Sequence, residues 1–244
     1  MKHFVICLLA LCAWHTAATA GDTPSHGMFS AVLSSHVRDG RIDYNMVRRD
    51  RRFAAYLQQL IATRPDTLSQ DEQLAFWINA HNAFAIKLVC DNYPLPSIRD
   101  LDKGQILERV MFKVDTGMYS LRSIIVDRLV PLRDTRIYAA LVFGARGCPP
   151  LRTEAYEPSR VNTQLDDQAS LFLGDTTRNV VANSTKQASL SRIFEWNLPA
   201  FGTSYQQVLS TVLAWQRNPV SEPPTTYQHW TVTFREFDWT LNGK

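Results

Sequence analysis

The sequence has few cysteines and little excess of charge of either sign. Only four of its 244 residues are cysteine, and no group of cysteine and histidine residues has the spacing of zinc ligands. This scarcity excludes a disulfide scaffold and gives no indication of a metal or other cofactor. The 26 basic and 23 acidic side chains give a formal net charge of +3. Because these charges are spread along the chain, we expect no nucleic-acid-binding face.

Long hydrophobic runs are also missing after the start of the chain. The apolar run Phe4–Trp14 is about half the roughly 20 residues that span a bilayer as a helix. Lys2 precedes this run, and the small residues Ala18-Thr19-Ala20 follow it, in the order of a cleavable secretory signal. We therefore expect a signal peptide over residues 1–20 and a single domain over residues 21–244. That domain is expected in the periplasm or secreted, without a transmembrane anchor.

The remaining sequence mixes helical and extended patterns. Its strongest signal is the capping box Ser69-Gln70-Asp71-Glu72, which opens a helix that is apolar on nearly every side and therefore central and buried. The other predicted helical segments are 28–37, 45–63, a short helix between 96 and 114, 121–129, 163–173, 191–196 and 205–215. The predicted strands are 41–44, 136–142, two weak strands about 180 and 188, and 230–234, with a hairpin turn at 115–117 and a polar connector at 217–226. Together they predict an α+β fold with helices packed on a mainly antiparallel sheet.

The loop from Phe143 to Pro150 carries the most chemically interesting residue, Cys148. Cys148 follows a predicted buried strand and precedes two prolines, so a rigid loop fixes its position. Beside a cation or a helix N-terminus its thiol would be a nucleophile for hydrolysis or acyl transfer. Buried cysteines also serve simply as packing residues. A disulfide with Cys90 is the third interpretation.

Three polar residues lie on the otherwise apolar central helix. Asn79 and Asn82 share one face, and we expect both to hydrogen-bond a neighbouring backbone segment, because unpaired buried amides cost roughly 1–3 kcal/mol each. His81 points elsewhere and is a general-base candidate only if the fold brings Cys148 to it. Arg146, beside Cys148, is either a structural charge partner or an anion contact.

Several motifs together resemble the bacterial domain of unknown function 547. They are Leu74-Ala75-Phe76-Trp77-Ile78-Asn79-Ala80-His81-Asn82-Ala83, Asn92-Tyr93-Pro94, the loop 144–151, Leu165-Asp166-Asp167-Gln168-Ala169, Asp39-Gly40-Arg41-Ile42-Asp43-Tyr44, Ser191-Arg192-Ile193-Phe194-Glu195-Trp196 and Phe237-Asp238-Trp239-Thr240-Leu241-Asn242. The resemblance covers almost all of residues 21–244. It implies a papain-like or transglutaminase-like fold and makes Cys148 the candidate nucleophile.

The chain departs from the family pattern where an imidazole is expected. Ile125-Val126 replace the Glu-His pair that members commonly have. Tyr138 occupies a position where a histidine is common, and Phe143 replaces a frequent second cysteine. The hypothesis favoured by these losses is a degenerate cysteine-hydrolase-like domain that binds a peptide or a cell-envelope component. The alternative is a periplasmic cysteine hydrolase or acyl transferase that uses Cys148, with His81 as base.

Overall fold

The computed structural model describes residues 24–216 and 227–244, and its core is built around one long helix, α4 (Gln70–Asp91). The predicted capping box is confirmed: the Ser69 amide donates to the Glu72 carboxylate at 2.8 Å. Fifteen of the 22 residues of α4 are buried, so this helix has no solvent face along most of its length. The predicted signal peptide and the connector 217–226 lie outside the described residues.

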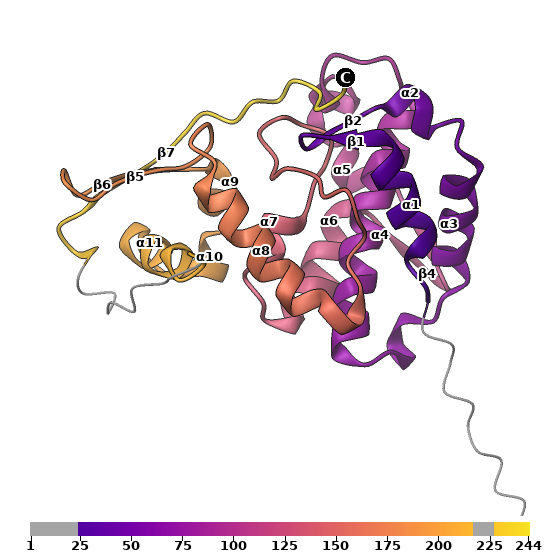
Figure 1. Ribbon diagram of the computed structural model, residues 1–244, viewed down its shortest axis with the longest axis horizontal. Helices are drawn as coiled ribbons and strands as arrows, with labels where there is room; N and C mark the ends of the chain where they lie inside the picture. Colours follow the sequence, from indigo (N-terminus) through magenta and orange to yellow (C-terminus); the bar gives the residue numbers. More distant parts are fainter. Residues whose placement is uncertain (1–23, 217–226) are drawn as a thin grey trace, which may run out of the picture.

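The first helices pack along one side of α4 (Figure 1). The predicted helix 45–63 is divided in two, because Asp50 caps a new helix by accepting from the Arg52 amide at 2.9 Å. The rings of Phe29 and Tyr56 stack with centroids 4.8 Å apart and join the outer helices to each other. The elements are α1 (Gly27–His36), the hairpin β1 (Val37–Arg38) and β2 (Arg41–Ile42), α2 (Tyr44–Val47) and α3 (Arg51–Ala62).

The segment after α4 consists of short turns around a second hairpin. The hairpin confirms the turn predicted at 115–117, and the Phe112 ring stacks on Phe84 of α4 with centroids 4.6 Å apart. The 3₁₀ turn η1 (Pro65–Thr67) precedes α4. The elements after α4 are the 3₁₀ turns η2 (Ile98–Asp100) and η3 (Asp102–Gly104), α5 (Ile106–Arg109), β3 (Phe112–Val114), β4 (Gly117–Tyr119), α6 (Leu121–Ser123), the π-helical turn η4 (Ile124–Leu129) and the 3₁₀ turn η5 (Val130–Leu132).

The predicted strand over residues 136–142 is wrong. Residues Ile137–Ala140 form the short helix α7, and the chain becomes extended only at Leu141. A short apolar run fits a buried helix as well as a buried strand, and packing against α8 (Val161–Gly174) decides for the helix here.

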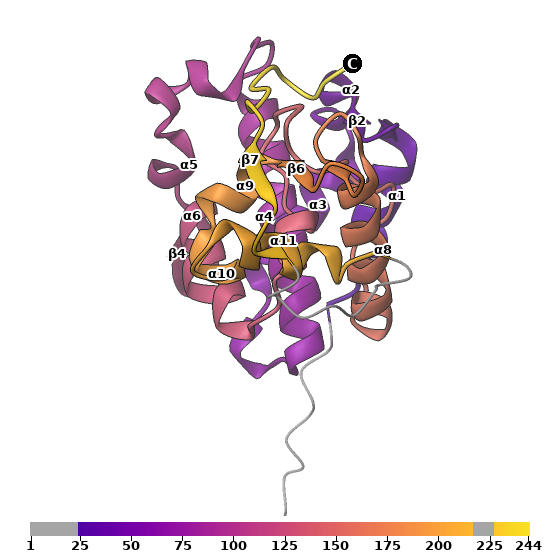
Figure 2. The ribbon, with the colours of Figure 1, turned by 90° about the vertical axis from the view of Figure 1, so that its left-hand side faces the viewer.

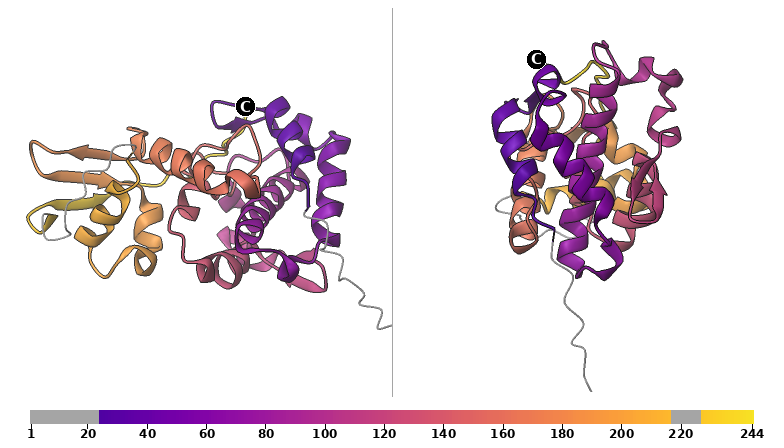
Figure 3. Two further views of the ribbon diagram at one scale, coloured as in Figure 1. Left: turned by 60° about the horizontal axis from the view of Figure 1, so that its bottom comes forward. Right: turned by 90° about the vertical axis from the view of Figure 1, so that its right-hand side faces the viewer.

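The largest sheet in the described part of the chain has three strands and lies at one end of the molecule, away from α1 and α3 (Figures 1 and 3). β6 pairs antiparallel with β5 and parallel with β7, so the predicted terminal strand does join a sheet. The α+β class is confirmed, but helices packed around α4, rather than on a mainly antiparallel sheet, form the body of the fold. The remaining elements are η6 (Pro158–Arg160), β5 (Val180–Ala182), β6 (Gln187–Leu190), α9 (Arg192–Trp196), α10 (Leu198–Phe201), α11 (Tyr205–Leu213) and β7 (Thr231–Phe234).

The tail after β7 runs back across the molecule to the first hairpin (Figures 1 and 2). Its carbonyls at Asp238 and Thr240 accept from the amides of Gly147 and Arg146, both at 2.8 Å, and Asn242 accepts from Ile42 at 3.2 Å. The tail therefore fastens the Cys148 loop to the N-terminal half of the chain. In the described segments, no helix combines the length and apolar character that crossing a membrane requires.

Candidate functional site

The loop that carries Cys148 is held in one shape by its glycines and by the tail. Gly144 has a φ of +88°, which disfavours any residue with a side chain. A Cβ on Gly147 would lie 2.7 Å from the ring of Phe237, so the tail covers the loop closely at this point. The loop and the tail therefore form one rigid unit around the cysteine.

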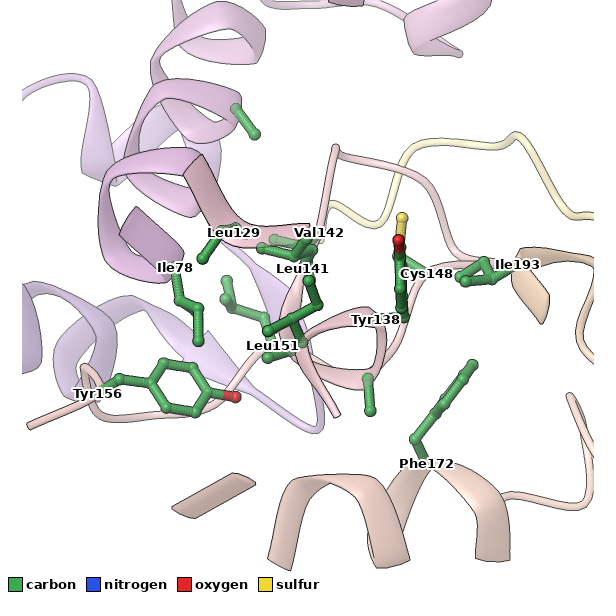
Figure 4. Close-up of a cluster of buried hydrophobic side chains, with 14 of the residues drawn as sticks. Ile78, Leu129, Tyr138, Leu141, Val142, Cys148, Leu151, Tyr156, Phe172 and Ile193 are labelled. Carbon is green, nitrogen blue, oxygen red and sulfur yellow. The ribbon is translucent and has the colours of Figure 1, made fainter. Parts of the chain in front are cut away.

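Cys148 lies inside this unit and not at its surface. It is 1% exposed and belongs to a cluster of buried hydrophobic side chains that includes Tyr138, Phe172 and Ile193 (Figure 4). The Phe143 amide donates to its Sγ at 3.5 Å. Burial raises the pKa of the thiol to about 12, because a thiolate loses its hydration there. The thiol is therefore protonated at neutral pH.

His81 is equally buried, at 1% exposed, and its ring lies against Asn82. Burial lowers its pKa to about 4, and its Nδ1 lies 3.3 Å from Oδ1 of Asn82. Over residues 24–216 and 227–244, no hydrogen bond joins His81 to Cys148. The predicted pair of Cys148 as nucleophile and His81 as base therefore has no hydrogen bond that would link it in the described residues.

The second cysteine of the domain excludes the disulfide interpretation. Cys90 and Cys148 are both free. The Cys90 thiol donates to the Tyr44 carbonyl at 3.7 Å, and burial raises its pKa to about 12. Neither thiol has the depressed pKa of a reactive cysteine.

The two asparagines of α4 each hold a separate backbone segment. Nδ2 of Asn79 donates to the Tyr156 carbonyl at 2.7 Å and its Oδ1 accepts from the Tyr156 amide at 2.9 Å. Asn82 donates to Ala140 at 2.9 Å and accepts from Val142 at 3.0 Å. Asn82 thus satisfies backbone groups at the end of α7, and Asn79 satisfies those of Tyr156, which lies beyond the cysteine loop. Neither segment pairs with a strand in the described residues, so the side chains of α4 take the place of a strand partner.

Two hollows flank the segment Cys148–Pro150, with Asp39 in the wall of both. The larger, here called the acidic cleft, has a volume of about 840 Å³. Its lining contains four carboxylates and one guanidinium, together with the apolar side chains of Leu151 and Leu171. The charged members are Asp39, Glu154, Asp167, Asp175 and Arg152.

The smaller hollow, here called the arginine cavity, has a volume of about 300 Å³ and reaches the Cys148 loop. Five guanidiniums and three carboxylates line it. Of the arginines, only Arg146 was expected from the sequence as a site residue; its side chain is exposed, and its carbonyl accepts from Arg178 at 2.5 Å. The others are Arg41, Arg178, Arg192 and Arg235.

The fold and the site define the protein as an α+β domain with a buried cysteine loop and a long, largely apolar central helix. The family model described as "Protein of unknown function, DUF547" matches residues 65–173, from the turn before α4 to near the end of α8. The match includes the motifs of α4, the cysteine loop and α8. Neither the curated proteins nor the solved structures gave a significant match.

Proposed function

We propose that the protein is a non-catalytic, peptide-binding member of a papain-like or transglutaminase-like group of domains. The observation that carries the proposal is the state of Cys148, which is buried and has a thiol pKa of about 12. At pH 7 such a thiol is ionised in about one molecule in 10⁵. No imidazole in the described residues bonds to it and activates it.

Tyr138, at the position where the resemblance leads us to expect a histidine, does not supply the missing base. It is 6% exposed, and burial raises the pKa of its phenol above the usual value of 10.0. A protonated phenol donates a hydrogen bond but does not remove a proton at neutral pH. The residues around Cys148 therefore favour packing over nucleophilic chemistry.

The acidic cleft is the proposed peptide site. Its volume of about 840 Å³ is within the usual range for ligand sites. Hydrogen bonds from Arg152 and Arg160 lower the pKa of Glu154 to about 2 despite its partial burial, and hydrogen bonds from Thr177 and the charge of Arg178 lower the pKa of Asp175. These carboxylates are ionised at neutral pH, and Glu154, Asp167 and Asp175 each pair with an arginine of the chain. A peptide with a basic side chain is the ligand that we propose for this lining and the apolar wall at Leu171.

The test of binding uses fluorescein-labelled, N-acetylated tetrapeptides that contain lysine, with anisotropy as the readout. We expect saturable binding that Leu171→Arg weakens at least about tenfold, because it places a positive charge in the cleft. The matched control is Met118→Arg, since Met118 on β4 and Leu171 are both 54% exposed and only Leu171 lines the cleft. Equal loss in both variants, or no binding at all, contradicts the peptide assignment.

The test of catalytic inactivity measures alkylation of Cys148 as a function of pH in the Cys90→Ala background. We expect labelling only as fast as the protein unfolds, because Cys148 is 1% exposed. Rapid labelling with a midpoint below about pH 7 indicates an activated thiolate and supports the alternative, a cysteine hydrolase or acyl transferase. Turnover of an amide or ester that Cys148→Ser abolishes identifies the same alternative.

We further propose that this domain is exported, on the sequence pattern of residues 1–20 alone. Cleavage after Ala20 leaves Gly21 as the first residue. The ligand is then a peptide or a peptide-bearing component of the cell envelope. Mass spectrometry of the protein from the periplasm and the medium checks this: an intact Met1 terminus in a cytoplasmic fraction contradicts it.

A further inference from the structure

The arginine cavity gathers cations from distant parts of the sequence into one wall. Arg41 lies on β2, Arg146 on the cysteine loop, and Arg178 just before β5, while Arg192 begins α9 and Arg235 follows β7. They meet because the tail and the cysteine loop are hydrogen-bonded to each other. Such a concentration of like charge in one hollow is unfavourable unless an anion compensates it.

Three of these arginines have side chains with no internal partner. Arg41, Arg146 and Arg235 donate no side-chain hydrogen bond and form no ion pair to any residue of 24–216 or 227–244. By contrast, Arg178 pairs with Asp175, although its Nε is buried without a partner.

The carboxylates in the wall offset part of this charge, since, beside the hydrogen bond from Thr240, the positive charges of Arg146 and Arg178 help to lower the pKa of the Asp238 carboxyl. Asp238 accepts from the Thr240 amide at 2.9 Å and from its hydroxyl at 2.5 Å, and these bonds lower the pKa of its carboxyl. Asp238 is thus ionised and turned to the tail. The other two carboxylates in the wall are Asp39 and Glu236. Arg178 and Arg192 pair with Asp175 and Glu195, which lie outside the lining.

We propose that the arginine cavity binds a phosphate group. The guanidiniums of Arg41, Arg146 and Arg235 have no competing side-chain hydrogen bond in the described residues. Each planar guanidinium fork binds two phosphate oxygens at once, so several of them suit a phosphate group better than a single carboxylate. The cavity, at about 300 Å³, is larger than phosphate alone and leaves room for a small organic part beside Phe237. This inference does not depend on the peptide site, because no residue of α8 lines the cavity.

Isothermal titration with inorganic phosphate and with glycerol 3-phosphate, at constant ionic strength, tests the proposal on the full domain. We expect saturable binding that Arg146→Gln and Arg235→Gln each weaken by about tenfold, as expected for loss of one charged hydrogen-bond donor. The matched control is Arg122→Gln: this side chain is 66% exposed, does not line the cavity and keeps only a 3.5 Å contact with Glu108.

Each outcome has a defined meaning. Tighter binding of glycerol 3-phosphate supports a phosphomonoester ligand, and tighter binding of inorganic phosphate supports the free anion. Acetate bound as tightly as phosphate, equal affinity in the wild type and both cavity variants, or no saturable binding overturns the proposal. Because Arg146 is exposed, the Arg146→Gln variant is expected to fold, and thermal unfolding verifies this before titration.

Discussion

Lowering the pH from 7 to 5 is expected to destabilise the protein through two buried histidines. His26 is 0% and His81 1% exposed, and burial lowers the pKa of each from 6.5 to about 4. Between these values the unfolded chain binds protons that the folded chain does not. Stability is therefore full above pH 6.5 and falls as the pH drops toward 4.

The magnitude follows from the size of the pKa shifts. A drop from 6.5 to about 4 corresponds to roughly 3 kcal/mol for each histidine once the pH is below 4. Between pH 7 and pH 5 the same linkage gives about 2 kcal/mol for each, and about 4 kcal/mol together. The carboxylate of Glu154, whose pKa is lowered to about 2, adds its own loss only below this window.

Urea unfolding at pH 7, 6 and 5, followed by tryptophan fluorescence, measures this loss. The readout is the slope of the unfolding free energy against pH. A substitution that lowers the stability equally at every pH leaves this slope unchanged, so such a loss does not obscure the effect of the histidines. We expect His81→Gln and His26→Gln each to remove about half of the slope. A slope that His81→Gln leaves unchanged refutes the reasoning, and it shows that His81 exchanges protons in the folded state as a catalytic base must.

Two further substitutions test the packing around the site, both by urea unfolding. Asn79→Ala is expected to cost about 2–4 kcal/mol, because it leaves both backbone groups of Tyr156 buried without partners; a loss below about 1 kcal/mol contradicts a role in holding that segment. Gly40→Ala is expected to cost about 1–3 kcal/mol more than Gly104→Ala, because both have positive φ but only the first places its Cβ 2.8 Å from Pro150. Equal costs in the two glycine variants show that no close contact forms there.

Features encoded by neighbouring residues were predictable from the sequence. The capping box at Ser69 and the apolar pattern that follows it identify α4 and its burial, because both signals depend on helical spacing alone. The polar pair Asn79 and Asn82 was recognisable for the same reason, since buried amides need partners. The four-residue helix α7 was not, because a short apolar run does not distinguish helix from strand.

The arginine cavity illustrates what the sequence does not encode locally. Arg41 and Arg235 are almost two hundred positions apart, and each by itself has the pattern of a solvated surface residue. The sequence left the burial of Cys148 as one of three interpretations, because the choice depends on the distant tail that covers the loop at Gly147. Both features arise from long-range contacts that no local pattern specifies.

The course of the tail also has a consequence for folding. Residues 238–242 supply the carbonyls that close the cysteine loop and join it to Ile42, a contact between segments almost two hundred positions apart. Contacts of such high sequence separation form late, because closing the intervening chain is entropically costly. During synthesis the cysteine loop therefore lacks its hydrogen bonds to the tail until residues 238–242 have left the ribosome.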